Sequence, residues 1–326
     1  MEKQKQFGLS MVRLIAMISI ISCHIMQYFG NISCYYLNVG VWLFLFISGF
    51  LYGKKDISDV TVFYKKRLVR ILVPYYIMLG VIILANLLQA ASITAKELIS
   101  SILCLQWYGK TVPNCGHLWY ISCILFCYLI TPILQWICEK NENKSLTKKC
   151  MLLVLAVLIL QVIYSLGGMK QATTSILPYI LGYFMSFNKI TLNSRVGGYS
   201  TVILVISLVL YCMMYAFEAL GYFAIRGILL EYYKSIIAIA ITMFFVQYSF
   251  GNAYIREIFD FSDKYSYGIY LTHHIFILGS LSVMSLTPYW WINVTISFLI
   301  ATITGMVLIW SSDKITVLLR KKRVIR

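Results

Sequence analysis

The chain alternates between long apolar stretches and short loops, and this alternation restricts the folds that it can adopt. Ten stretches are long enough, or nearly so, to cross the hydrocarbon core of a bilayer as helices. They cover residues 8–29, 36–53, 73–91, 118–138, 150–167, 174–187, 198–217, 231–249, 266–284 and 290–312, and the sixth is short. Hydrophobic residues make up 60% of the chain and charged residues only 12%. The sequence therefore predicts an all-α, polytopic transmembrane helical bundle of about ten spans.

Lysine and arginine are concentrated in alternate loops, and this asymmetry predicts the orientation of the chain. If the N-terminus is cytoplasmic, 22 of the 28 basic residues fall in cytoplasmic segments and only four in external ones. Cytoplasmic loops of membrane proteins are enriched in these residues, so we expect both termini in the cytoplasm. The same distribution explains the net charge of +16 without a nucleic-acid partner. The basic C-terminal segment from Arg320 to Arg326 is interpreted as a cytoplasmic anchor.

The segments between the apolar stretches are short, so we expect one membrane domain over residues 1–326 with no attached soluble domain. The longest of them, residues 92–117, is predicted to be external. Nine cysteines are scattered along the chain without a C-x-x-C motif, and we expect no metal site. Cys104 and Cys115 both lie in the external segment, where the sequence leaves open whether they form a disulfide.

Arg13 and His24 lie on one face of the first apolar stretch. Eleven residues at about 100° each amount to three helical turns plus about 20°, and the rise between the two residues is about 16 Å. Ionisable side chains are costly in lipid, so both should face the protein interior or a watery cavity, which indicates a functional site. The alternative is an arginine that extends to the membrane interface beside a hydrogen-bonded core histidine.

The basic segment before the third stretch carries Arg67 and Arg70, which lie on the same side if the segment is helical. One interpretation is that these charges only orient the following span. The other is a phosphate site, because arginine binds phosphate oxygens in bidentate fashion. Arg13 enters the membrane at the same end of its helix. The three arginines would then surround one mouth, with His24 three turns deeper, which suits a long donor such as coenzyme A.

The ninth stretch carries a polar stripe. Ser266, Tyr270 and His273 recur at positions i, i+4 and i+7, so they share one helical face that must look inward. The stripe is either part of a site, since histidine is well matched to proton transfer near neutral pH, or a hydrogen-bonded packing seam. The neighbouring His274 is one of only four histidines in the chain.

The fourth stretch opens with His117, Trp119 and Tyr120 at the predicted outer surface. Trp and Tyr are common anchors at the membrane interface, which is the simpler interpretation. Aromatic residues beside polar groups also make suitable platforms for sugar rings.

Together these features resemble the acyltransferase-3 family of integral membrane O-acyltransferases. That family includes O-antigen, capsule and exopolysaccharide acetylases, fucose-4-O-acetylase-like proteins and the membrane domain of vancomycin-resistance serine racemases. The resemblance rests on Arg13 with His24, the apolar motif at residues 40–51, the basic run that ends at residues 74–75, and the motifs at residues 117–120 and 266–273. These motifs occur in the family order and cover most of the chain.

The resemblance implies a ten-span enzyme of the bacterial cytoplasmic membrane. It would move an acyl group, usually acetyl, from cytoplasmic acyl-CoA to a hydroxyl of a cell-surface or lipid-linked glycan. His24 would be the catalytic residue with the support of Arg13, and Arg67 and Arg70 would bind the acyl donor. No permanently bound cofactor is implied, because acetyl-CoA is a substrate.

The acceptor or supporting polar site would comprise the side chains at the outer end of the fourth stretch and along the polar stripe, namely His117, Trp119, Tyr120, Ser266, Tyr267, Tyr270 and His273. We expect neither the extracytoplasmic hydrolase-like domain nor the racemase domain that some family members carry. We therefore expect no amino-acid racemisation, and handling of the acceptor would fall to the membrane domain.

Two mechanisms remain open for His24, namely a general base for direct transfer and a nucleophile that accepts the acyl group and passes it on. Two other classes of protein also remain open. A transporter or flippase of a lipid-linked glycan would share the polytopic helices, the buried polar residues and the arginine-lined mouth. A non-catalytic membrane sensor would not need Arg13 and His24 on one face.

Overall fold

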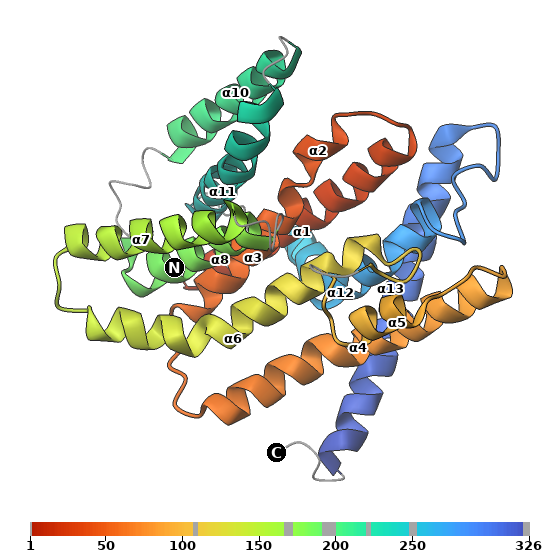
Figure 1. Ribbon diagram of the computed structural model, residues 1–326, viewed down its shortest axis with the longest axis horizontal. Coiled ribbons are helices and arrows are strands. Elements are labelled where there is room, and N and C mark those ends of the chain that lie inside the picture. Colours follow the sequence, from red (N-terminus) through yellow and green to blue (C-terminus); the bar gives the residue numbers. More distant parts are fainter. Residues whose placement is uncertain are drawn as a thin grey trace. The chain divides into compact units, whose positions relative to one another are not determined.

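In a computed structural model, residues 2–106, 110–165, 172–190, 200–219, 223–247 and 253–321 are described, and they form helices and loops without a strand (Figure 1). Each predicted stretch overlaps one long helix, which confirms the all-α prediction. The long helices are α1 (Glu2–Tyr28), α3 (Val39–Tyr52), α4 (Val60–Leu88), α6 (Trp119–Lys140), α7 (Leu146–Ser165), α8 (Ala172–Phe187), α10 (Ser200–Ala219), α11 (Phe223–Gln247), α12 (Ala253–Ile277) and α13 (Trp290–Lys321). Short helices α2 (Cys34–Leu37), α5 (Ala95–Ile102) and η1 (Gly116–Leu118) lie between them.

Five segments of the described chain are long and apolar enough to cross a membrane. They are Phe7–Tyr28, Cys34–Tyr52, Val60–Leu88, Gly116–Lys140 and Trp290–Arg320, and shorter apolar helices cover Ser175–Phe187, Leu204–Met213 and Tyr232–Gln247. These helices give the chain the character of a membrane protein. The number of ten spans and the cytoplasmic termini stay predictions.

Several helix boundaries differ from the predicted stretches because polar side chains cap the helices. Helix α4 begins at Val60, well before residue 73. The side chain of the preceding residue, Asp59, accepts a hydrogen bond from the Val62 amide at 2.9 Å. The basic run is therefore helical, as the phosphate-site interpretation requires. Helix α12 ends at Ile277 rather than at residue 284, and the Ser282 hydroxyl donates to the Ile277 carbonyl at 2.7 Å. Hydropathy alone carries no signal for either cap.

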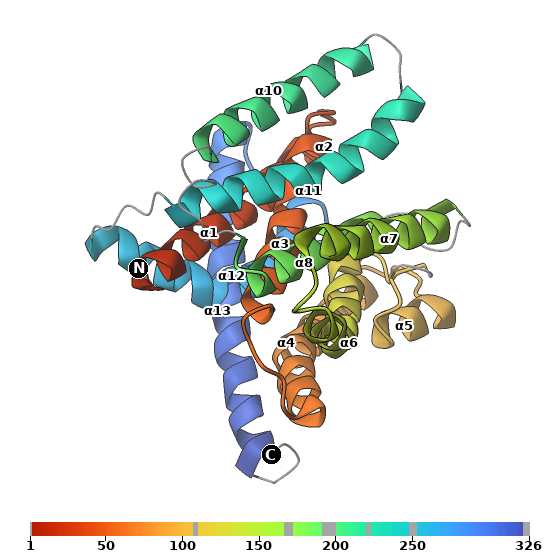
Figure 2. The same cartoon turned by 90° about the vertical axis from the view of Figure 1, so that its left-hand side faces the viewer.

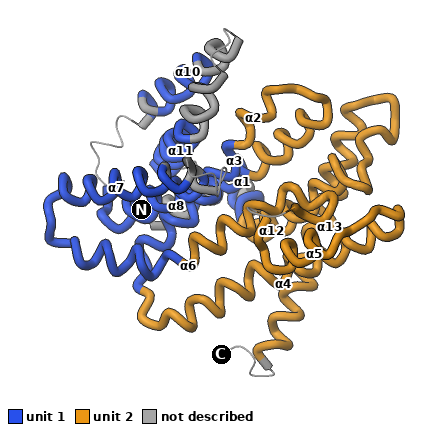
Figure 3. Tube along the Cα trace, viewed as in Figure 1, with its two compact units in different colours: residues 1–16, 39–56, 130–260 blue, residues 17–38, 57–129, 261–326 orange. Residues whose placement is uncertain are grey.

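The chain divides into two compact units, each built from three segments (Figure 3). Unit 1 comprises Met1–Ala16, Val39–Asp56 and Ile130–Asp260, and unit 2 comprises Met17–Asn38, Ile57–Leu129 and Phe261–Arg326. Helices α1, α6 and α12 contribute residues to both units. The expectation of a single membrane domain stays a prediction.

In unit 1, glycines allow helices α3 and α8 to approach backbone to backbone. A Cβ atom on Gly49 would lie 2.0 Å from the Tyr179 carbonyl oxygen, and one on Gly182 would lie 2.3 Å from the Phe46 carbonyl oxygen. Small residues at such crossings are typical of membrane helices, where association depends on van der Waals packing. Helices α10 and α11 of the same unit lie side by side (Figure 2).

Unit 1 also buries a cation. Lys234, which the sequence places within a span, is 2% exposed, and its ammonium lies 4.4 Å from the centre of the Trp42 ring. A cation over the face of an indole is stabilised by the ring quadrupole, most strongly where water is excluded. This contact accounts for a charged side chain in an apolar helix.

In unit 2, helices α12 and α13 are joined by small residues spaced four apart on each helix. A Cβ atom on Gly268 would lie 2.3 Å from the Gly305 carbonyl oxygen. One turn further along, the Thr272 hydroxyl donates to the Ala301 carbonyl at 2.9 Å. This close contact fixes α12, which carries polar side chains of the site described below, against α13.

The segment between α5 and α6 is anchored by buried polar groups. The Tyr75 hydroxyl donates to the Ser101 carbonyl at 2.5 Å and accepts from the side-chain amide of Gln106 at 2.6 Å. Cys104 and Cys115 are buried free thiols, so no disulfide joins them in the structure. Burial raises the pKa of the Cys104 thiol to about 11 and that of Cys115 to about 12.

Candidate functional site

All four histidines of the chain gather in unit 2. His24 comes from α1, His117 from η1, and His273 and His274 from α12. The His24 ring centre lies 5.1 Å from that of His273 and 4.9 Å from that of His274. His117 stacks on His274 with ring centres 4.4 Å apart and lies 5.6 Å from His273. We call these four side chains the histidine cluster.

Backbone carbonyls fix the hydrogen positions on the buried rings of the cluster. Nδ1 of His273 lies 2.7 Å from the Tyr270 carbonyl, and Nε2 of His117 lies 3.2 Å from the Leu271 carbonyl. A carbonyl only accepts, so each of these nitrogens carries the hydrogen. The His274 ring is hydrogen-bonded to the backbone of Asn114.

The opposite nitrogens of the same rings are acceptors without a partner. Nδ1 of His117, Nε2 of His273 and Nδ1 of His274 are buried and have no hydrogen-bond partner in the described chain. Buried polar atoms are normally paired, so such a group calls for a functional explanation. The cluster offers three acceptor nitrogens and suits a ligand that brings hydrogen-bond donors.

His24 differs from its neighbours because its partner is a side chain. Nδ1 of His24 lies 3.1 Å from the Gln27 side-chain oxygen, one helical turn further along α1. The amide oxygen only accepts, so Nδ1 carries the hydrogen and Nε2 presents a lone pair. His24 and His274 are only partly buried, whereas His117 and His273 are buried. Because the unpartnered ring nitrogen of His274 is itself buried, His24 is the member of the cluster better placed to meet a substrate.

Three tyrosines surround the cluster. The Tyr270 hydroxyl donates to the His117 carbonyl, and its ring packs on His117 at 5.7 Å and on Tyr120 at 5.2 Å. Tyr267 stacks on Tyr270 at 6.5 Å, and its hydroxyl donates to the Ile71 carbonyl of α4 at 2.9 Å. The stripe on α12 is therefore a packed polar wall that ties α12 to η1, α6 and α4.

A second feature of unit 2 is an open cleft of about 790 Å³ between α4, α12 and α13. Basic side chains predominate among the described residues that line it, with two aspartates. These charged residues are Lys66, Arg67, Arg70, Lys264, Arg320, Asp263 and Asp313. A hydrogen bond to Tyr265, with a smaller effect of the nearby Asp313, raises the pKa of Lys264 above its ordinary value, so Lys264 is charged at neutral pH. We call this feature the basic cleft, and its excess of positive charge suits a phosphorylated ligand.

The basic cleft and the histidine cluster are connected through α12. Tyr267 lines the cleft and stacks on Tyr270, which in turn contacts the cluster. Lys264 and His273 are nine residues apart in one helix, a rise of about 14 Å. An extended ligand whose phosphates lie at the cleft would therefore need an arm of about that length to reach the histidines.

The structure brings together most of the residues that the sequence singled out. Six of them meet at the histidine cluster and the tyrosines around it, namely His24, His117, Tyr120, Tyr267, Tyr270 and His273. Arg67 and Arg70 both line the basic cleft. Ser266 is buried on the same face of α12, and Trp119 is partly exposed on the first turn of α6.

Arg13 and His24 both belong to α1, but Arg13 is part of unit 1, whereas Arg67 and Arg70 belong to unit 2. The arrangement of the three arginines around one mouth stays a prediction. The interpretation of Arg320 as part of an anchor was incomplete, because its side chain lines the basic cleft.

Sequence reasoning missed several residues of the site, namely His274, Asn114, Gln27, Lys66, Lys264, Asp263 and Asp313. The His-His pair at residues 273–274 was a usable signal, since both rings face the cluster. No such signal existed for the missed residues of the basic cleft, because the helices that line the cleft, such as α4 and α13, are far apart in the sequence. Among the described residues, no group of three histidine, cysteine or acidic side chains is arranged to hold a metal ion.

Comparison with known families gives the class of protein. The family model of the acyltransferase-3 domain, described as an acyltransferase domain, matches residues 7–311, which is nearly the whole chain. The chain therefore belongs to this family, and it is a membrane acyltransferase. No curated protein and no solved structure matches the chain.

Proposed function

We propose that this enzyme transfers an acyl group, most simply acetyl, from acyl-CoA to a hydroxyl of a cell-surface or lipid-linked glycan. The observation that carries the proposal is that α12 of unit 2 contributes to both the basic cleft and the histidine cluster, with a rise of about 14 Å from Lys264 to His273. Their separation matches a donor with a phosphorylated head and a long arm that ends in the reactive thioester.

The basic cleft is the proposed site for the phosphates of the acyl donor. Arg67 and Arg70 bind phosphate oxygens through their guanidinium groups, and Lys264 and Arg320 add charge from the other helices. The two aspartates offer acceptors for ribose hydroxyls or the adenine amino group. The basic residues of the cleft belong to segments that we predict to be cytoplasmic, so the donor would enter from the cytoplasm.

His24 is the proposed general base. Its Nε2 takes the proton of the acceptor hydroxyl as the hydroxyl oxygen attacks the thioester carbonyl. The carbon–sulfur bond then breaks, and CoA leaves as a thiolate that receives the same proton from His24. The products are an ester and a free thiol, with no net release of a proton. Gln27 holds His24 in the tautomer that presents Nε2 as the acceptor. We propose that Arg13 supports this step from the same face of α1.

The acceptor is proposed to be rich in hydroxyl groups. The three buried acceptor nitrogens of His117, His273 and His274 need hydrogen-bond donors, and sugar hydroxyls supply them. The aromatic residues beside the cluster, Tyr120 and Tyr270, add apolar surface of the kind that sugar rings pack against. This combination supports a glycan in preference to a small apolar alcohol.

The test compares the purified enzyme with a His24→Ala variant for release of free CoA from acetyl-CoA, with and without extracted cell-surface glycan. The wild type is expected to release CoA and to place labelled acetate on the glycan, whereas His24→Ala does neither although it folds and binds acetyl-CoA. Equal release by both proteins would exclude His24 as the catalytic residue. No release with any glycan would exclude the proposed acceptor class.

The role of His24 as a base is tested separately from acyl transfer itself. Labelled acetyl-CoA is incubated with the enzyme in the absence of acceptor, and the intact protein is weighed after a rapid quench. A general base leaves the mass unchanged. An acetyl adduct on His24 that disappears when glycan is added would replace the general-base role by a covalent relay, and would leave the proposed reaction intact.

A further inference from the structure

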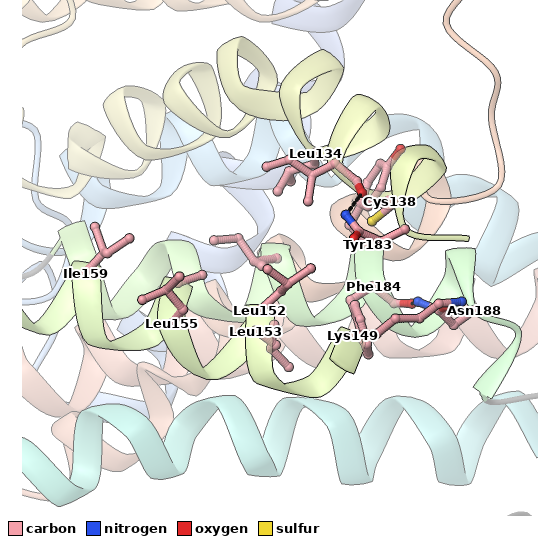
Figure 4. Close-up of a pocket in the computed structure, with 14 residues that line it drawn as sticks. Leu134, Cys138, Lys149, Leu152, Leu153, Leu155, Ile159, Tyr183, Phe184 and Asn188 are labelled. Carbon is pink, nitrogen blue, oxygen red and sulfur yellow. Dashed lines mark hydrogen bonds between the residues drawn. The ribbon is translucent and has the colours of Figure 1, made fainter. Parts of the chain in front are cut away.

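An apolar groove lies between α6, α7 and α8 of unit 1, and it shares no residue with the histidine cluster or the basic cleft. It encloses about 220 Å³ and is lined almost entirely by aliphatic and aromatic side chains. Figure 4 shows Leu134, Leu152, Leu155, Ile159 and Phe184 along its length. A space of this size and lining suits a hydrocarbon chain and offers a sugar no hydrogen-bond partners along most of its length.

One end of the groove is polar. The Lys149 ammonium donates to the side-chain oxygen of Asn188 at 2.9 Å, and the amide nitrogens of Asn188 and Asn141 donate to the backbone carbonyls of Phe184 and Ile137. Asn188 uses one of the three ammonium hydrogens, so others are available for an anion. Of the described residues that line the groove, Lys149 alone carries a charge. This end therefore attracts a negatively charged group.

The length of the groove matches one leaflet of a bilayer. Lys149 and Ile159, at opposite ends of the lining on α7, are ten residues apart and thus about 15 Å apart along the helix axis. The hydrocarbon core of a bilayer is about 30 Å thick, so 15 Å is the depth reached by the acyl chains of one leaflet. An amphiphile with its head at Lys149 would place its tail beside Ile159.

The surroundings of the groove fit the same occupant. Val154 and Leu158 on the other face of α7 are 58% and 56% exposed, as expected for a helix that faces lipid. The exposed Lys144, just before α7, and the exposed Lys148, in its first turn, lie close to Lys149 in the sequence. Clusters of lysine at the cytoplasmic end of membrane helices attract anionic headgroups.

We propose that this groove binds one anionic phospholipid, with an acyl chain along α7 and its phosphate on the Lys149 ammonium. The proposal does not depend on the enzymatic function, because none of its residues belongs to the histidine cluster or the basic cleft. The bound lipid fills the space between α7 and its neighbours and anchors α7 to α6 and α8.

The test uses native mass spectrometry of the purified full chain with an equal mixture of phosphatidylglycerol and phosphatidylcholine of the same chain length. The wild type is expected to retain phosphatidylglycerol preferentially. Lys149→Gln keeps a side-chain donor for Asn188 but removes the charge, and is expected to lower the ratio of the two bound lipids about fivefold. Lys148→Gln is the matched control, because Lys148 is exposed and does not line the groove.

A second pair of variants tests the hydrocarbon part of the site. Ala156→Phe places a ring in the groove and is expected to reduce retention of both lipids, whereas Val154→Phe, on the outward face of α7, leaves retention unchanged. Helical content by circular dichroism shows whether Ala156→Phe folds, and if it does not, the two lysine variants decide the question. Equal lipid ratios for Lys149→Gln and Lys148→Gln would overturn the proposal. The proposal would also be overturned if the wild type were a dimer and Ala156→Phe a monomer that had lost no lipid, because the groove would then bind a second copy of this chain.

Discussion

Replacing Gly268 with alanine is expected to disturb the basic cleft by separating the two helices that form two of its sides. The new Cβ would lie 2.3 Å from the Gly305 carbonyl oxygen, whereas ordinary contact begins at 3.4 Å, so α12 and α13 must separate by about 1 Å. Overpacking of this kind destabilises a protein by about 1–3 kcal/mol. Because Lys264 lies on α12 and Arg320 on α13, the separation also displaces two of the cations that we propose bind the donor phosphates.

Two measurements check this prediction. Misplacement of substrate by about 1 Å lowers enzymatic rates up to about 100-fold, so kcat/KM for acetyl-CoA should fall by one to two orders of magnitude together with the unfolding temperature. Gly80→Ala is the matched control, because a Cβ on Gly80 meets no atom within 4 Å and alanine favours the helix by about 0.5–1 kcal/mol. If Gly268→Ala and Gly80→Ala had the same unfolding temperature and the same kcat/KM, the reasoning about this helix contact would be refuted.

Three further predictions concern single side chains. Arg67→Gln should raise KM for acetyl-CoA about tenfold by the loss of a charge-assisted hydrogen bond, whereas Lys65→Gln, outside the cleft, should leave KM unchanged; equal effects would argue against a specific donor site. His274→Phe keeps a ring on His117 but removes the acceptor nitrogen, so kcat should fall at least tenfold without loss of folding, as measured by acetate transfer and thermal unfolding. Cys104, whose raised pKa of about 11 leaves little thiolate at pH 8, should react with iodoacetamide about 100-fold more slowly than an ordinary thiol, and rapid alkylation would show that it is exposed.

The helical fold was accessible from the sequence because hydropathy alone defines it. Each long helix overlaps a predicted apolar stretch, and the stripe from Ser266 to His273 follows from the helical repeat. The boundaries of the helices were predicted less well from the sequence. The extension of α4 depends on the capping side chain of Asp59, and the early end of α12 depends on Ser282. Neither contact can be recognised from the hydropathy of the sequence.

Only part of the candidate site could be predicted from the sequence. His24 and His273 were identified because each is a polar residue on the inward face of an apolar helix. His274 points about 100° away from His273 around α12, so a search along one face overlooks it, although His24 contacts both rings. Arg320 was interpreted as an anchor because nothing in the local sequence indicates that α13 carries it to the Arg67 and Arg70 side of α4.

The histidine cluster has a practical consequence for spectroscopy. The chain has four histidines, and all four belong to the cluster, so no imidazole elsewhere contributes a background signal. A sample labelled with ¹⁵N only in histidine would report on this one site in a protein of 326 residues. Nitrogen chemical shifts distinguish a protonated ring nitrogen from one that bears a lone pair, so a single spectrum would read the tautomer of every ring. Addition of acetyl-CoA or a glycan to such a sample would then identify which imidazole each proposed substrate approaches.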